Sequence, residues 1–305
     1  MQSVSITAQL FGPVSFRRNG APLNLPHTCA WLFARLLFND GRPVDRHRLA
    51  VLIGSDCPDE TARRRLNTAV WRLRRAVEPR GAPRDSVLAT SGNALAVACP
   101  AWVDAAEFDA TCGHLEDPRV WTPQHAERVM RGIKLYQGGF LDGYTDEWAL
   151  AERGRLADLH LTALVRLAQW HRLRGESERV IDLARRAVAL EPLREDLHRL
   201  LMRAYVEAGL PELAVTQLGR CRTILADELG VEPLPETVAA ARRTDGLGEA
   251  AAQQVVFALH ELERSQAELR RLSQLLNMSV HEFGVRQARL RSTIERDVRG
   301  QSGDR

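Results

Sequence analysis

The sequence predicts a mainly α-helical protein with a winged helix-turn-helix and a small β-sheet at its N-terminus, a tetratricopeptide-like helical repeat domain, and a long C-terminal helix. Three observations carry this prediction. Short strands, three helix-forming stretches and a hairpin follow one another early in the chain. A 34-residue period runs through the middle, and a seven-residue period of apolar residues lies near the end. We therefore expect domains over residues 1–100, 101–243 and 244–305.

The first 100 residues carry the elements of a winged helix-turn-helix. Apolar and polar residues alternate in three short stretches before residue 26, which predicts three strands. A largely apolar stretch predicts a helix over 28–38, and a second helix follows Asp45, a residue type that caps helix starts. A hairpin over 86–98 with its tip at Ser91-Gly92-Asn93 is expected to be the wing.

The third helix, expected over 58–79, has two different faces. Apolar residues recur at helical spacing from Leu66 to Val77, which predicts a stripe against a core. Asp59 or Thr61 is expected to cap the start of this helix. The opposite face and the flanks carry Arg63, Arg64, Arg65, Asn67, Thr68, Trp71, Arg72, Arg74 and Arg75.

This concentration of arginine favours a nucleic-acid partner. Guanidinium groups form paired hydrogen bonds with phosphates and with guanine edges. We expect the third helix to enter the major groove of double-stranded DNA, with the wing on the adjacent sugar-phosphate. A solvated, arginine-rich surface helix is the alternative. The predicted DNA-binding residues are the nine polar residues above together with Arg84, Ser91 and Asn93 of the wing.

The charge of the chain is unevenly distributed. Residues 1–100 hold 14 arginines and 7 acidic residues, a net charge of +7, whereas the remainder holds 28 basic and 32 acidic residues, a net charge of −4. The N-terminal third is therefore the part suited to a polyanion. The alternative function is a helical-repeat scaffold or signalling adaptor with an accessory N-terminal domain, which has no need of this concentration of charge.

The sequence predicts a protein that is not an enzyme and that has no cofactor or metal site. The motifs of nucleotide-binding loops, serine hydrolases and zinc proteases do not occur, and the five cysteines form no C-x-x-C pair. Neither a long apolar run nor a signal peptide occurs, which predicts a cytoplasmic protein that contacts no membrane. Of the 42 basic residues 41 are arginine, as is typical of a GC-rich and hence bacterial genome.

The middle of the chain repeats itself after 34 residues. Leu167 aligns with Leu201, Gly175 aligns with Gly209, and Pro192 ends the first unit. A glycine between two helices and small residues at the helix crossing are typical of tetratricopeptide pairs, which stack into a surface that binds proteins. A purely structural helical bundle is the alternative.

Several motifs resemble those of one bacterial family. Tyr136–Trp148 and two later segments resemble the bacterial transcriptional activator domain, and three N-terminal motifs resemble the winged helix that usually precedes it. Together they resemble the Streptomyces antibiotic regulatory protein family. The later segments are 187–196 and 225–237, and the N-terminal motifs are Leu10-Phe11-Gly12, Arg42-Pro43-Val44 and Trp71-Arg-Leu-Arg-Arg75.

This resemblance implies a function and partners. It implies a transcriptional activator that binds direct repeats near a promoter, as in secondary-metabolite gene clusters, and that contacts RNA polymerase on the nucleoid. It assigns residues 63–75 to the major groove and implies self-association through the helical domains.

The C-terminal stretch over 250–298 lacks proline and has a heptad pattern. Leu262, Leu269 and Leu276 recur every seven residues, but half of the companion positions are polar. This pattern predicts a weak coiled coil that dimerises the protein or receives a signal. A helix that folds back on the repeat domain is the alternative.

Overall fold

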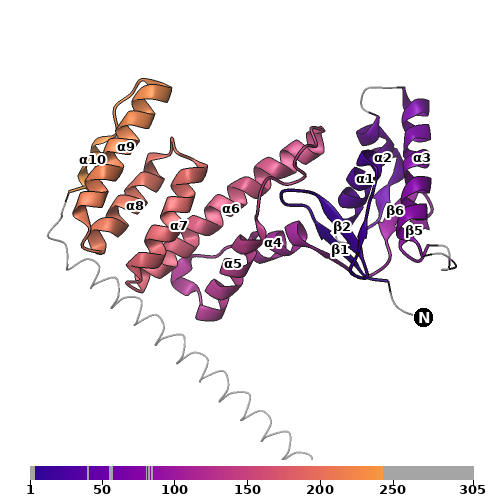
Figure 1. Ribbon diagram of the computed structural model, residues 1–305, viewed down its shortest axis with the longest axis horizontal. Coiled ribbons are helices and arrows are strands. Elements are labelled where there is room, and N and C mark those ends of the chain that lie inside the picture. The colour runs from indigo at the N-terminus through magenta and orange to yellow at the C-terminus, as the bar shows by residue number, and fades with distance from the viewer. Residues whose placement is uncertain are drawn as a thin grey trace, which may run out of the picture. The chain divides into compact units, whose positions relative to one another are not determined.

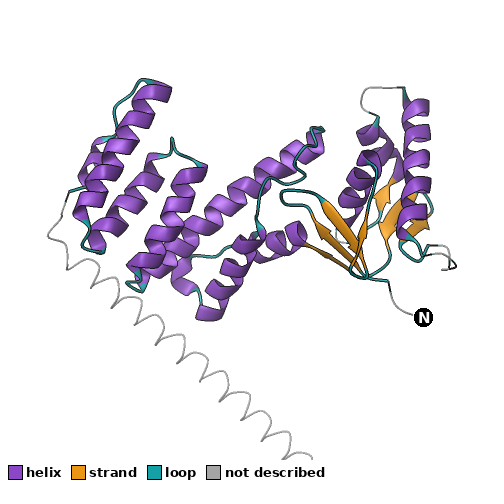
Figure 2. Ribbon diagram, viewed as in Figure 1, coloured by secondary structure: helices purple, strands orange, loops and turns teal. Residues whose placement is uncertain are grey.

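The computed structural model describes residues 4–39, 41–54, 58–79, 81, 83 and 85–242. The predicted tail at 244–305 lies outside these residues. Residues 1–172 and 176–244 belong to one compact unit, which contains both the strands and the helical repeats (Figure 1). Within the described residues, the predicted fold class is confirmed: helices dominate, and the strands lie in the N-terminal part (Figure 2).

A four-stranded sheet opens the fold, one strand more than the sequence predicted. Its order is β3-β2-β1-β7, with β7 parallel to β1 and the other pairs antiparallel. The added strand is Ala101–Val103, which pairs with β1 across 95 residues of chain, a distance over which local patterns reveal no pairing. The strands are β1 (Ile6–Gln9), β2 (Ser15–Arg18), β3 (Ala21–Leu23) and β7 (Ala101–Val103).

The winged helix-turn-helix follows the predicted order. Asp45 caps α2, because its side chain accepts a hydrogen bond of 3.1 Å from the backbone N–H of Arg48. A second sheet of order β4-β6-β5 joins the hairpin to the start of α2. The elements are α1 (His27–Leu37), β4 (Val44–Asp45), α2 (Arg46–Ile53), α3 (Asp59–Val77), β5 (Leu88–Ser91) and β6 (Ala94–Val97).

The third helix, α3, buries the predicted stripe but starts differently. Leu66, Val70, Leu73 and Val77 are all buried, as predicted. The expected cap by Asp59 or Thr61 is wrong, since Pro58 occupies the N-cap position without a side-chain hydrogen bond. Asp59 instead lies in the first turn, where a carboxylate still stabilises the helix dipole.

The helical part confirms the 34-residue repeat. Gly175 and Gly209 both have positive φ angles, 70° and 74°, at the turns between paired helices. Leu167 and Leu201 are both buried at equivalent positions, and α7, α8 and α9 lie side by side (Figure 1). The elements are α4 (Asp104–Cys112), the 3-10 helix η1 (Pro118–Val120), α5 (Pro123–Leu135), α6 (Glu147–Leu173), α7 (Ser177–Leu190), α8 (Glu195–Glu207), α9 (Pro211–Leu229) and α10 (Pro235–Ala240).

The segment 136–146, which we call the connector, packs against the winged helix-turn-helix. Its Asp146 accepts a hydrogen bond of 2.8 Å from the indole Nε1 of Trp31 in α1. Its Phe140 lies 5.0 Å, ring centre to ring centre, from Phe38 at the end of α1. Arg153 of α6 donates hydrogen bonds to three carbonyls of the connector, which holds its shape. The helical part therefore supports α1, which in turn packs against α3.

A buried histidine beside the connector makes stability depend on pH. His160 is 4% exposed and stacks on Tyr136 at 4.2 Å. Burial, with a smaller contribution from Arg186, lowers the pKa of His160 to about 4. Because the unfolded chain binds this proton near pH 6.5, stability contributed by neutral His160 is complete above pH 6.5 and is lost between pH 6.5 and about 4.

As the pH falls from 6.5 to about 4, we expect protonation of His160 alone to lower the free energy of unfolding by about 3 kcal/mol. Substituting His160→Phe keeps the ring stack but removes the titration, so the variant should lose this part of the pH dependence. Urea denaturation at pH 7 and pH 4.5 measures the difference. An identical pH dependence in both proteins would contradict the assignment.

Candidate nucleic-acid interface

The outer face of α3 presents cationic and aromatic side chains to solvent. Arg64, Thr68 and Arg72 are exposed there, opposite the buried stripe. The Trp71 side chain is 59% exposed, and the guanidinium of Arg75 lies 5.5 Å from the centre of its ring. The exposed indole gives this cationic face an apolar, polarisable surface for contacts with a partner.

The start of α2 extends this face with residues that sequence reasoning missed. The guanidinium of Arg46 donates a hydrogen bond of 2.6 Å to the side-chain carbonyl of Asn67 on α3. His47 and Arg48 next to it are exposed. The signal was available, because three basic residues directly follow the helix cap Asp45 and so lie at the first turn of a helix.

Arg74 lies between α3 and the wing. Its guanidinium donates a hydrogen bond of 2.6 Å to the hydroxyl of Thr90 and forms an ion pair of 2.6 Å with Asp85. Its side chain is only 16% exposed. The charge of Arg74 is thus neutralised by a neighbour in the fold, and its side chain is less exposed than that of Arg64.

The tip of the wing is fastened to the start of α2. Asn93 donates a hydrogen bond of 2.9 Å to Asp45, and its carbonyl accepts one of 2.8 Å from the backbone N–H of Arg46. The hydrogen bond from the Arg48 N–H, with that from Asn93, lowers the pKa of Asp45. Ser91 is exposed at the end of β5, whereas Arg84 lies outside the described residues. The wing, α2 and α3 therefore form one continuous surface.

Arg63 and Arg65, the other predicted DNA-binding arginines of α3, are both exposed on the first half of this helix. Glu60 lies with Asp59 in the first turn of the same helix. It forms an ion pair of 2.6 Å with Arg64, and both side chains are more than three-quarters exposed. An exposed pair of this kind contributes little to stability, so Arg64 is free to exchange partners.

We expect Glu60→Gln to tighten DNA binding about two- to fivefold, because the change removes one negative charge from the face and releases Arg64. Fluorescence anisotropy with a labelled duplex measures this effect. Glu178→Gln, at an exposed glutamate of the first turn of α7, is the matched control and should leave the affinity unchanged. Weaker binding by Glu60→Gln would place Glu60 in the recognition of bases.

The described residues offer little for other kinds of chemistry. They contain no group of three or more histidine, cysteine or acidic side chains able to hold a metal ion. No helix among them is long and apolar enough to cross a bilayer.

The fold and this face define the class of protein: a winged helix-turn-helix joined to helical repeats. Residues 103–244 match the family model of the bacterial transcriptional activator domain. The chain carries this domain, and the predicted resemblance to the Streptomyces antibiotic regulatory protein family is confirmed.

The related proteins are transcriptional regulators, a class distinct from enzymes. The chain is 28% identical over 241 residues to the regulatory protein AfsR of Streptomyces coelicolor, covering 77% of this chain and 24% of AfsR. It thus spans about a quarter of the length of that relative. It is 26% identical over 238 residues to the transcriptional regulatory protein MoaR1 of Mycobacterium tuberculosis, covering 76% of each chain.

A solved structure has the same fold. Mycobacterium tuberculosis EmbR, determined in complex with a low-affinity phosphopeptide, matches with a TM-score of 0.66 and 21% sequence identity. The match covers 85% of this chain and 70% of the EmbR chain.

Proposed function

We propose that this protein is a sequence-specific, DNA-binding transcriptional activator. The observation that carries the proposal is the exposed arginine and tryptophan face of α3, bordered by the basic start of α2 and by the wing. An α-helix with such a face fits the major groove, and a neighbouring wing reaches the sugar-phosphate.

Each side chain has a role in this proposal. Arg64, Thr68 and Arg72, at the centre of the exposed face, read base edges. Trp71 contacts thymine methyl groups or sugars through its apolar ring. Arg74 and Asn93 position the wing through their hydrogen bonds to Thr90 and Asp45. The phosphate contacts are assigned to Arg46, Arg63, Arg65, Arg75, Arg84 and Ser91.

Each of the three segments of the chain has its own role in this proposal. Residues 1–100 bind promoter direct repeats, and 101–243 mediate self-association and contact RNA polymerase. The relatives named above support regulation of transcription, and the target genes would be those of a biosynthetic cluster. The tail at 244–305 strengthens dimerisation or receives a signal. The protein acts in the cytoplasm, where it binds DNA of the nucleoid.

A titration of the full chain against a pool of genomic fragments, at two salt concentrations, tests the function. The full chain is required because α1 packs against the connector. Selective enrichment of a few fragments, with an affinity that falls steeply as salt rises, is the expected result. Equal, weak binding to all fragments would contradict sequence-specific recognition and favour the scaffold.

A further inference from the structure

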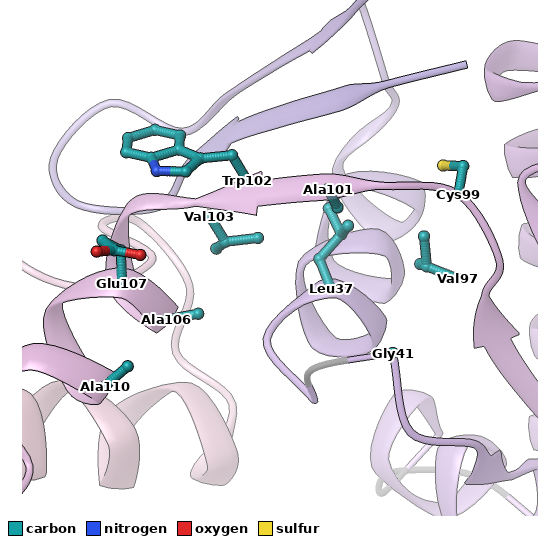
Figure 3. A pocket seen from close by; sticks show the side chains of 10 residues that line it. All are labelled: Leu37, Gly41, Val97, Cys99, Ala101, Trp102, Val103, Ala106, Glu107 and Ala110. Atoms are coloured by element: carbon teal, nitrogen blue, oxygen red, sulfur yellow. The ribbon is translucent and has the colours of Figure 1, made fainter. Parts of the chain in front are cut away.

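A cavity of about 330 Å³ lies at the free edge of β7. β7 is the last strand of its sheet and pairs on one side only, with β1. Figure 3 shows the space bounded by β7, by the end of α1 and by α4. Its volume is within the range of small-molecule sites, which begins at roughly 300 Å³.

The side chains that line the cavity are mainly apolar, although polar atoms make up about half of its surface. Leu37 of α1, Val97 of β6 and Val103 of β7 contribute branched side chains, and Ala106 and Ala110 of α4 leave space because they are small. Figure 3 shows Leu37 and Val103 on the cavity side of β7. These walls fit the hydrocarbon body of a ligand.

One charged side chain lines this space, the exposed carboxylate of Glu107 on α4. Although 14 of the first 100 residues are arginine, no basic residue is among the described residues that line the cavity. A carboxylate without a neighbouring cation repels acids and phosphates and attracts ammonium groups. The negative charge of Glu107 thus favours a ligand with a positive charge.

The free edge of β7 supplies a further acceptor. The carbonyl of Pro100 accepts a hydrogen bond of 3.0 Å from the backbone N–H of Ile6 on β1. Because carbonyls alternate along a strand, the carbonyl of Ala101 points to the opposite, unpaired edge. Ala101 lines the cavity, so its carbonyl can accept a hydrogen bond from a polar group of a ligand. Figure 3 shows Ala101 and Glu107 at separate places along the lining.

We propose that this cavity binds a small primary amine with an apolar body, with the ammonium on Glu107. The amine class follows from the carboxylate, and the apolar body follows from the aliphatic side chains of the lining. No residue of α3 is among the described residues that line the cavity. Amine binding can therefore be tested whether or not α3 binds DNA.

Isothermal titration calorimetry of the full chain with 2-phenylethylamine and with 3-phenylpropionate tests the proposal. The two probes have the same aromatic body and opposite charge. We expect saturable, one-to-one binding of the amine and none of the acid. Glu107→Gln should weaken amine binding at least about tenfold, because it removes a charge-assisted hydrogen bond. Ala110→Leu should abolish binding by filling the space, and Glu178→Gln is the matched control.

Three results would overturn the proposal: no saturable binding up to about 10 mM amine, acid binding as tight as amine binding, or undiminished amine binding by Glu107→Gln. The peptide acetyl-Val-Lys-Val-amide serves as a third probe. Binding of this peptide without binding of the amine would mean that β7 recruits an extended strand instead, which also overturns the amine site.

Discussion

Arg72→Ala is expected to weaken binding to the cognate DNA site by about 1–3 kcal/mol, roughly 5- to 150-fold. Arg72 is exposed at the centre of the α3 face, one residue from Trp71, so its removal costs no buried packing. A guanidinium that pairs with guanine also discriminates against the other bases. The variant should therefore lose its preference at one base position as well as affinity.

Anisotropy titrations with the cognate duplex and with duplexes altered at single positions measure both effects. Arg220→Ala, at an exposed arginine of α9, is the control for a lost positive charge and should bind as the parent does. If Arg72→Ala lowers affinity equally for every duplex and reduces the salt dependence, Arg72 contacts phosphate instead. If affinity and preference are both unaltered, Arg72 does not belong to the interface.

Phe140→Ala is expected to lower the free energy of unfolding by about 3–5 kcal/mol. Phe140 of the connector is completely buried, and its ring packs against Phe38 of α1 and against Trp148 of α6 at centre-to-centre distances of 5.0 and 5.7 Å. Alanine would leave a cavity where the connector meets the winged helix-turn-helix. A loss of this size is a large share of the roughly 5–15 kcal/mol that stabilises a typical domain.

Urea denaturation followed by circular dichroism measures this loss. Leu150→Ala, at a 48% exposed position early in α6, is the matched control and should change stability by less than about 0.5 kcal/mol. Phe140→Leu should retain most of the stability because it leaves a smaller cavity. A loss below about 1 kcal/mol for Phe140→Ala would mean that the connector is not a principal support of α1.

Local patterns predicted the two faces of α3 and the helical repeat. The stripe from Leu66 to Val77 is buried and Trp71 is exposed, because a helix maps sequence spacing directly onto its faces. The repeat was predictable because Gly175 and Gly209 both require a left-handed turn, which glycine adopts without strain.

Contacts between distant residues were beyond such patterns. Arg35 lies on a helix that the sequence predicted correctly, yet its guanidinium is buried 4.7 Å from the ring centre of Trp148, and this burial lowers its pKa. Helical spacing placed Arg74 on a flank of α3, but Asp85, just before the wing, neutralises its charge. Both placements depend on partners that no periodicity of their own helices identifies.

The sequence by itself determined the helices, the hairpin, the repeat and the arginine-rich character of α3, because each follows from spacing along a few turns of chain. Only the tertiary structure decided that β7 joins β1, that Arg46 extends the α3 face, and that the connector supports α1. Pairing and packing join residues separated by tens of positions. They are selected by the free energy of the whole fold, and no local stretch of sequence encodes them alone.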